Sequence, residues 1–114
     1  MAKSYIPDAG DLVWIHFDPQ AGHEQAGHRP ALVVSSAAYN GVTGLMLFCP
    51  MTTEIKGYPF EVVIPGNPIG AVLADQVKSL DWRARKTVYK GKASASELRD
   101  VRAKIAALIE SAGD

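Results

Sequence analysis

The sequence lacks the features that would tie it to a membrane, a disulfide framework or an obvious polyelectrolyte partner. Cys49 is the single cysteine, so no intrachain disulfide can form, and no apolar run approaches the length of a membrane span. The 12 basic and 12 acidic residues cancel, so net charge gives no sign of a nucleic-acid partner. The N-terminus has no apolar region of the kind found in secretory signals. These absences predict a cytoplasmic protein whose cysteine is a buried, inert thiol.

The sequence does contain enough apolar material for one core. Of its 114 residues, 47% are hydrophobic and 21% are charged, which is ordinary for a globular chain and argues against disorder. A chain of this length buries a single core. We therefore predict one domain over residues 1–114.

Short apolar runs separated by turn residues predict a mainly β fold. The strand-like segments are residues 12–17, 31–35, 45–51, 60–64, 71–80 and, more briefly, 87–89. Asn40-Gly41 and Thr43-Gly44 predict a turn before the third strand. Ser94 and Glu97 form the capping box of an amphipathic C-terminal helix. We expect a small curled sheet or barrel packed by this helix.

Charge is unevenly distributed even though it sums to zero. Between Lys78 and Lys92, six basic residues stand against only Asp81, with Trp82 and Tyr89 among them. A basic stripe with aromatic residues is typical of a surface that binds a phosphate backbone. The same pattern also suits a solvated strand whose lysines discourage edge pairing. Both interpretations remain open on the sequence alone.

Residues 24–30 gather a carboxylate, an amide, an imidazole and a guanidinium in what is predicted to be a long loop ending at Pro30. His23 and His28 are five residues apart, which on a helix rotates them by about 140° rather than placing them on one face. Glycines and Pro30 argue against a helix here. We therefore reject a zinc-protease motif and predict neither a metal nor a cofactor.

Phosphodiester cleavage without a metal suits these residues better. Arg29 presents paired donors to phosphate oxygens and stays charged, and Glu24 can act as a base or hold Arg29 in place. Thr52, at the end of the third predicted strand, has a hydroxyl that can donate to phosphate. The structural alternatives are a surface ion pair between Glu24 and Arg29, and a Thr52 hydroxyl that satisfies nearby backbone.

At these residues the sequence resembles the MazF/PemK/Kid family of bacterial toxin endoribonucleases, and is closest to its MazF branch. The resemblance spans residues 5–109 and is carried by residues 10–14, 24–31, 50–53, 56–63, 74–79 and 82–85. It implies an SH3-like β-barrel of the CcdB/PemK type with a C-terminal helix, assembled as a homodimer. It also implies a cognate antitoxin whose acidic tail occupies the RNA site.

The resemblance further implies a type II toxin that cleaves single-stranded mRNA at specific sequences without a metal ion. The products are 2′,3′-cyclic phosphate and 5′-hydroxyl ends, and the outcome is arrest of translation and growth. The catalytic arginine and threonine of the family fall on Arg29 and Thr52, and Glu24 occupies the acidic position of the same loop. The residues that we expect to bind RNA are Phe17, His28, Lys56, Asp75, Gln76 and Lys78.

Two positions depart from the family pattern. His16 replaces a residue that is often acidic in MazF relatives, and Leu73 stands where the Kid branch has an arginine beside the retained Asp75. The Kid assignment of acid and base therefore does not transfer, and His16 is either a partly buried strand residue or a supplementary acid or base. The alternative function, from another class, is inhibition of DNA gyrase by protein contact, as in the structurally similar CcdB group.

Overall fold

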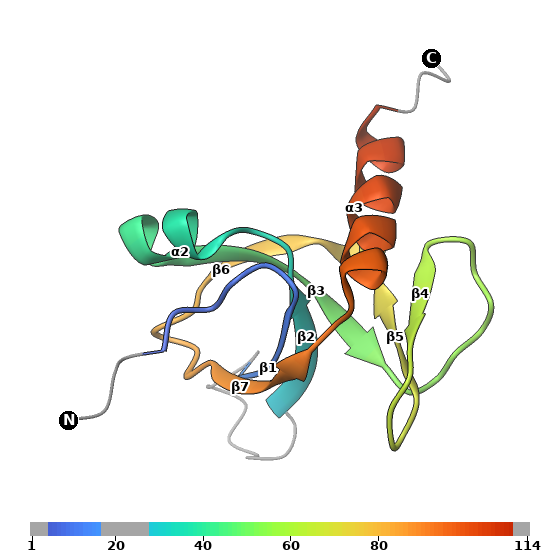
Figure 1. Cartoon of the computed structure of the whole chain (residues 1–114), viewed down its shortest axis with the longest axis horizontal. Helices are drawn as coiled ribbons and strands as arrows, with labels where there is room; N and C mark the ends of the chain where they lie inside the picture. The colour runs from blue at the N-terminus through green and yellow to red at the C-terminus, as the bar shows by residue number, and fades with distance from the viewer. Residues whose placement is uncertain (1–4, 17–27, 111–114) are drawn as a thin grey trace.

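An antiparallel sheet that curls on itself forms the centre of the computed structural model, which describes residues 5–16 and 28–110 (Figure 1). The strands follow the order β4-β5-β3-β2-β1-β7, and β6 pairs with β3. The predicted Phe17 and Glu24 lie outside the described residues. The elements are β1 (Asp11–His16), β2 (His28–Val33), α2 (Ala37–Thr43), β3 (Leu45–Thr52), β4 (Glu61–Ile64), β5 (Gly70–Leu73), η1 (Ala74–Gln76), β6 (Lys78–Asp81), β7 (Val88–Lys92) and α3 (Ala95–Ile109).

Apolar side chains from both faces of the central strand β2 are fully buried, as a doubly covered strand requires. Ala31 and Val33 join a cluster with Ile15 and Phe48, whereas Leu32 joins a second cluster on the opposite face. Successive side chains in a strand point to opposite faces, so β2 links the two clusters. The predicted mainly β fold with a covered central strand is confirmed.

Helix α3 covers the second cluster and is the predicted amphipathic helix. Ser94 accepts a hydrogen bond from the backbone N–H of Glu97, and the Glu97 carboxylate accepts one from the Ser94 N–H, so the predicted capping box is present. Val101 is fully buried. Leu98 and Ile105 pack against the same cluster. No helix in the described part of the chain is long and apolar enough to span a membrane.

Cys49 lies in this cluster, as predicted for a structural thiol. Burial is the main cause that raises its pKa to about 12, with a smaller contribution from the charge of Asp75. The thiol therefore stays protonated at neutral pH, and a protonated thiol is a poor nucleophile.

The turn predicted around Asn40-Gly41 is wrong, because these residues lie inside helix α2. Ser36 caps the helix by accepting from the Tyr39 N–H at 3.4 Å, and Gly44 ends it with φ 77°. The Asn40 amide is fully buried and donates to the carbonyls of Pro7 and Ser35. These long-range hydrogen bonds override the local turn preference of the sequence.

The single strand predicted over residues 71–80 is also wrong, because η1 divides it into β5 and β6. Both strands run along the same side of β3. Phe48 pairs with Lys78 and Met51 pairs with Val72, so three steps along β3 match six steps along the other segment. The surplus residues form η1, whose Ala74 is buried in the cluster under α3.

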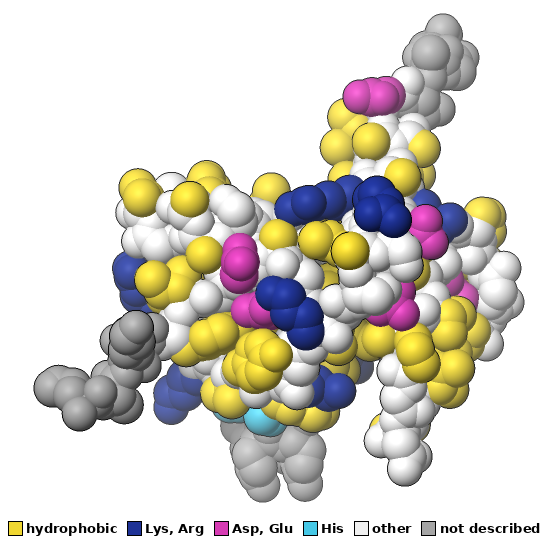
Figure 2. All heavy atoms as spheres, in the orientation of Figure 1, with side chains coloured by type: hydrophobic (Ala, Val, Ile, Leu, Met, Phe, Trp, Pro, Cys, Tyr) yellow, Lys and Arg dark blue, Asp and Glu magenta, His cyan; other side chains and the backbone are white. Residues whose placement is uncertain are grey.

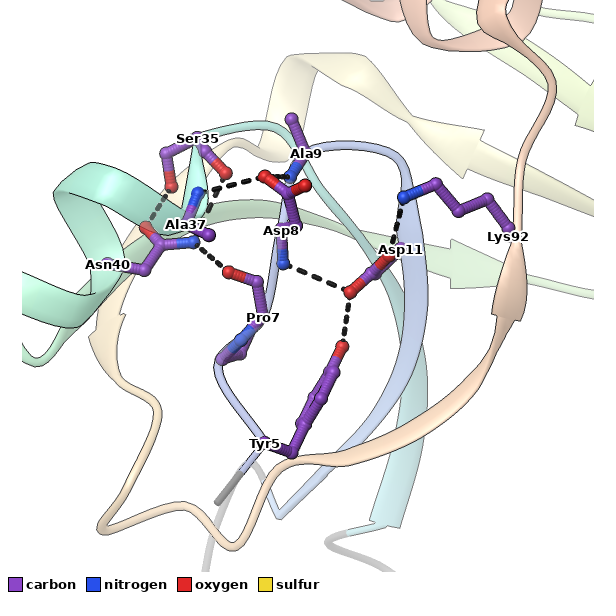
Figure 3. Close-up of polar contacts among 9 residues, drawn as sticks. All are labelled: Tyr5, Pro7, Asp8, Ala9, Asp11, Ser35, Ala37, Asn40 and Lys92. Carbon is purple, nitrogen blue, oxygen red and sulfur yellow. Dashed lines mark hydrogen bonds and ion pairs between the residues drawn. The ribbon is translucent and has the colours of Figure 1, made fainter. Parts of the chain in front are cut away.

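A hydrogen-bonded network around the buried Asp11 fastens the N-terminal segment to three other elements (Figure 3). The Tyr5 hydroxyl and the Asp8 backbone N–H donate to one carboxylate oxygen of Asp11, and Lys92 of β7 donates to the other at 3.0 Å. The Asp8 carboxylate in turn accepts from the Ala37 N–H at the start of α2. This last hydrogen bond is the main cause that lowers the pKa of Asp8. Asp11 therefore joins the segment before β1 to strand β7, and Asp8 extends this network to helix α2.

Replacing Asp11 with alanine is expected to lower the free energy of unfolding by about 2–3 kcal/mol, because the Tyr5 and Asp8 donors lose their acceptor in a partly buried place. Denaturant titration followed by circular dichroism measures the change. Asp100→Ala, an exposed carboxylate on α3, serves as the control and should stay within about 0.5 kcal/mol. An Asp11→Ala protein as stable as this control would contradict the role given to Asp11.

Candidate active site

The candidate site lies where strands β2 and β3 separate. The two strands pair from Val33↔Phe48 to Ala31↔Pro50. Beyond this point the start of β2 pairs only with β1, and the end of β3 pairs only with β5. Residues 28–30 and residues 51–52 therefore belong to strand ends that diverge from each other across an opening.

Proline chemistry explains why the strands separate here. The last pair is Ala31↔Pro50, and Pro30 directly precedes Ala31 in β2. Neither proline has a backbone N–H with which to extend the ladder. Pro30 pairs with Trp14 of β1, and no strand pairs with its other side. The missing N–H of Pro30 therefore costs no hydrogen bond to β3. The prediction that a loop extends to Pro30 is wrong in this detail, since β2 already begins at His28.

A hollow of about 560 Å³ occupies the opening and brings several predicted residues together. The predicted residues in its lining are His28, Arg29, Thr52 and Gln76, and residues that the sequence did not single out as site residues, among them Glu54 and Leu73, complete the walls. The side chains supply a guanidinium, an imidazole, hydroxyls, an amide and a carboxylate around a space large enough for a phosphodiester group. Sequence reasoning missed Glu54, for which the only signal was its place two residues after Thr52.

Arg29 is exposed on β2, opposite Ile15 of β1. Within the described residues its guanidinium forms no hydrogen bond or ion pair. The predicted ion pair with Glu24 lies outside the described residues and stays a prediction. A guanidinium at the rim of a hollow can bind two oxygens of one phosphate, because its donors form a planar fork.

Thr52 ends β3 with its hydroxyl already oriented. Its Oγ1 accepts a hydrogen bond from the Glu54 N–H at 3.0 Å, which is the local backbone interaction considered as the structural alternative. This interaction uses a lone pair and leaves the hydroxyl proton available for donation. The bond to Glu54 therefore fixes Oγ1 without preventing Thr52 from donating to an anion in the hollow.

His28 belongs to a row of rings along the outer side of β1 and β2. Its ring centroid is 5.4 Å from that of Trp14 and 5.6 Å from that of His16. His16 is directly opposite His28 in the sheet and half-buried, which agrees with a partly buried strand histidine. His16 is not among the residues that line the hollow.

The loop between β3 and β4 brings Lys56 to a smaller hollow next to the first one. This hollow, of about 130 Å³, shares Thr52, Glu54 and Leu73 with it. The Glu61 carboxylate accepts from the backbone N–H groups of Lys56 and Gly57, and Gly57 has φ 81°. Glu61 thereby fixes a backbone conformation that glycine adopts without strain. Glu61 was not predicted from the sequence, and its function is to position the loop.

The remaining predicted RNA contacts lie along the same side of β3. Asp75 is exposed in η1 next to Gln76, and Lys78 is exposed at the start of β6. Neither Asp75 nor Lys78 lines the hollow. Both are close in sequence to Gln76, which does line the hollow.

Several members of the basic stretch make contacts within the protein. Lys92 pairs with Asp11, and the Arg83 guanidinium lies 4.6 Å over the Trp82 ring. Arg85 donates to the His16 carbonyl, whereas Lys90 lies 5.4 Å over the Trp14 ring. Figure 2 shows Lys and Arg side chains dispersed among apolar ones on the visible face. None of these basic residues lines the hollow that holds Arg29.

No three histidine, cysteine, aspartate or glutamate side chains in residues 5–16 and 28–110 are grouped so that they could hold a metal ion. The polar groups in the lining of the hollow are one guanidinium, two hydroxyls, one imidazole, one amide and the carboxylate of Glu54. The guanidinium, hydroxyl, imidazole and amide groups can donate hydrogen bonds to an anion and stabilise negative charge as it develops, whereas the carboxylate can only accept.

Comparison with known proteins identifies a family that matches most of this chain. The PemK-like, MazF-like toxins of type II toxin–antitoxin systems match residues 8–109 of the chain. The endoribonuclease toxin MazF of Escherichia coli is 54% identical over 110 residues, which cover 96% of this chain and 99% of that protein.

Solved structures from Deinococcus radiodurans have the same fold. A chain from the crystal structure of MazF superposes with a TM-score of 0.83 at 57% identity, covering 93% of this chain and 98% of its own. A chain from the crystal structure of MazE-MazF gives a TM-score of 0.83 at 50% identity, covering 94% of this chain and 98% of its own.

Proposed function

Because this chain belongs to the family of PemK-like, MazF-like toxins of type II toxin–antitoxin systems, we propose that it is a sequence-specific endoribonuclease. Its substrate is single-stranded mRNA, its action needs no metal ion, and cleavage stops translation and growth. The observation that supports this most strongly is the hollow in which Arg29 and Thr52 face a common space. Because mRNA is a cytoplasmic substrate, we place the protein in the cytoplasm.

The proposed reaction is attack of a ribose 2′-hydroxyl on the adjacent phosphorus. The 2′-oxygen loses its proton to a base, the phosphorane gains negative charge, and the 5′-oxygen leaves with a proton. The products are a 2′,3′-cyclic phosphate and a 5′-hydroxyl. No water is consumed in this step, so the protein needs only to orient the phosphate, stabilise its charge and move one proton.

Arg29 and Thr52 divide the charge stabilisation in this proposal. The Arg29 guanidinium binds two phosphate oxygens and keeps its positive charge throughout, while the Thr52 hydroxyl donates to one of them. Glu24 holds Arg29 or takes the proton. His28, in the lining of the same hollow, contacts the substrate.

The RNA strand on either side of the cut is held by other groups in this proposal. Lys56, on the loop before β4, lines the smaller neighbouring hollow, and Gln76 of η1 lines the first hollow itself. Asp75 and Lys78 continue from Gln76 along η1 and the start of β6. Phe17 provides a surface for base stacking. Zero net charge is compatible with this interface, because binding depends on the local charges beside the strand.

The partner in the proposed system is a cognate antitoxin with an acidic tail that competes with RNA for the site. A MazE-MazF crystal structure from Deinococcus radiodurans, which resembles this chain over nearly its whole length, supports such a partner. Carboxylates of the tail would bind the same donors as the RNA phosphates. The alternative of gyrase inhibition has less support, because the Escherichia coli relative is an endoribonuclease toxin.

We further propose a homodimer that packs through the end of α3. Figure 1 shows α3 projecting away from the sheet, and Leu108 and Ile109 near its end are 53% and 76% exposed. A mostly apolar hollow of about 350 Å³ lies beside them, lined by Pro59, Phe60, Lys104, Ala107 and Leu108. Apolar side chains grouped on a projecting helix are typical of an interface between protein chains.

Purified protein is expected to cut single-stranded RNA in the presence of EDTA and to leave 5′-hydroxyl ends, because no metal takes part in the proposed reaction. Arg29→Ala should slow cleavage by at least about 100-fold, since the developing charge loses its main donor. Gel analysis of a labelled RNA measures both results. Arg99→Ala, an exposed arginine on α3, is the matched control and should cut normally.

Absence of cleavage by folded, antitoxin-free protein would overturn the proposed function. Normal cleavage by the Arg29→Ala variant would overturn only the role assigned to that residue. Sequencing the 5′-hydroxyl ends released from a long RNA identifies the sequence that is cut.

Thr52→Val is expected to reduce the cleavage rate by about 100-fold, because it removes the hydroxyl that donates to phosphate. Thr52→Ser keeps this hydroxyl and should retain most of the activity. The valine variant also loses the acceptor for the Glu54 N–H, which can lower its stability. Thermal unfolding of both variants measures this loss of stability separately from the loss of activity. Equal activity of the valine and serine variants would show that the hydroxyl has no part in the reaction.

Leu108→Glu is expected to convert the homodimer into a monomer, because a charge would be buried at the proposed interface. Light scattering coupled to size-exclusion chromatography gives the mass directly. Val42→Glu is the matched control, since Val42 on α2 is 86% exposed and far from α3 in sequence. A dimeric Leu108→Glu protein, or a monomeric wild type, would contradict this interface.

A further inference from the structure

A second hollow, of about 270 Å³, lies against the one that holds Arg29. The two share Pro30, Met51, Thr52 and Thr53, so the strand ends that diverge at Pro30 and Pro50 form a wall of both. The residues that belong to the second hollow alone are Trp14, Pro68, Gly70 and Lys90. We propose that this second hollow is a nucleobase site that takes one unpaired base next to the phosphate bound by Arg29 and Thr52. This inference rests on the proposed function.

The chemistry of the lining favours a base over a second phosphate. Trp14, Met51 and Pro68 supply apolar surface, whereas Arg29 and Gln76 line only the first hollow. A nucleobase is a flat apolar ring system with polar edges, and proteins bind unpaired bases by packing them against aromatic side chains. The two hollows thus match the two parts of a nucleotide, with polar groups around the phosphate and apolar groups around the base.

Lys90 supplies the polar contact that a base edge needs. Its ammonium lies 5.4 Å from the centroid of the Trp14 ring, and its side chain extends from the exposed edge strand β7. An ammonium donates hydrogen bonds and accepts none. It therefore favours a base edge that presents a carbonyl oxygen or an unprotonated ring nitrogen.

The sheet holds Trp14 in place before any ligand arrives. Trp14 is directly opposite Pro30 in β2 and opposite Val88 in β7. The His28 ring packs against it, with centroids 5.4 Å apart and planes inclined by 34°. A stacking surface that is already ordered reduces the entropic cost of binding a flexible strand.

Gly70 keeps the far side of the second hollow close to Thr52. A Cβ atom at this position would lie 3.2 Å from the Thr52 carbonyl oxygen and 3.4 Å from the terminal methyl of Met51. A side chain at residue 70 would therefore push β5 away from the end of β3 and change the wall that the two hollows share. The turn between β4 and β5, which carries Pro68, lies beside the end of β3 in Figure 1.

The test uses the full-length protein and a short single-stranded RNA that contains the cleaved sequence, with a 2′-deoxy sugar at the scissile nucleotide so that it stays intact. Each base is replaced in turn by an abasic site, and fluorescence anisotropy gives the dissociation constant for every combination of RNA and protein. The protein variants are Trp14→Ala and Lys90→Ala. Because Lys90 is exposed, its variant remains informative if Trp14→Ala fails to fold.

One abasic position beside the cut is expected to weaken binding to the wild-type protein by at least about fivefold, as loss of one stacked base does. The same abasic substitution should hardly weaken binding to Trp14→Ala, because this variant has already lost the surface on which the base stacks. Lys86→Ala removes one positive charge from the turn before β7 and is the matched control for Lys90→Ala. It should weaken binding of every RNA by the same factor and leave the pattern of abasic effects unchanged.

Trp14 fluorescence gives an independent measurement. The wild-type signal should be quenched by the intact RNA and less so by the critical abasic RNA, and the response should be absent in Trp14→Phe, which retains only the buried Trp82. If each abasic position weakens binding by the same factor in the wild type, in Trp14→Ala and in Lys90→Ala, the base site is refuted. The proposed cleavage activity is not affected by that result. If the wild type cuts no RNA, the same titrations use the short single-stranded RNA that binds it most tightly. Loss of one base effect in the pocket variants then keeps the base site while the proposed function fails.

Discussion

The missing backbone donors of Pro30 and Pro50 are the constraint on which the site depends. A continuous ladder between β2 and β3 would close the opening, because paired strands lie only about 5 Å apart. Pairing instead stops at Ala31↔Pro50, and each strand continues with a different partner. The sheet thereby holds Arg29 and Thr52 on two rigid strand ends across a gap. Strand residues therefore form most of the candidate site, and residues from the connecting segments complete it.

Much of the architecture was predictable because it depends on local patterns. The alternation of apolar residues, the Ser94 capping box and the buried Cys49 each follow from short stretches of sequence, and the structure confirms them. Helix α2 and η1 were not predictable in this way. Asn40 is helical because it bonds to Pro7 and Ser35, and η1 exists because β3 pairs with two segments in different registers.

In the candidate site, too, some residues were predictable from local sequence and others depend on long-range contacts. Arg29, Thr52, His28 and Gln76 were predicted and line one hollow, and Lys56 lies beside it. Trp14 and Lys90 were not singled out as site residues, because they are 76 positions apart and meet only through the pairing of β1 with β7. Glu61 was missed because its carboxylate contacts backbone groups, which no side-chain motif reveals. Phe17 and Glu24 lie outside the described residues and remain predictions.

The shared wall at Thr52 has a consequence for how such a protein can diversify. The hollow with Arg29 is bounded largely by paired strand ends, whereas Pro68 comes from a turn and Lys90 from an edge strand. Turns and edges accept substitutions and length changes more readily than paired central strands. Selection can therefore reshape the proposed base site while the proposed phosphate site stays constant. If both proposals hold, one scaffold can acquire new target sequences without changing the residues that carry out the reaction.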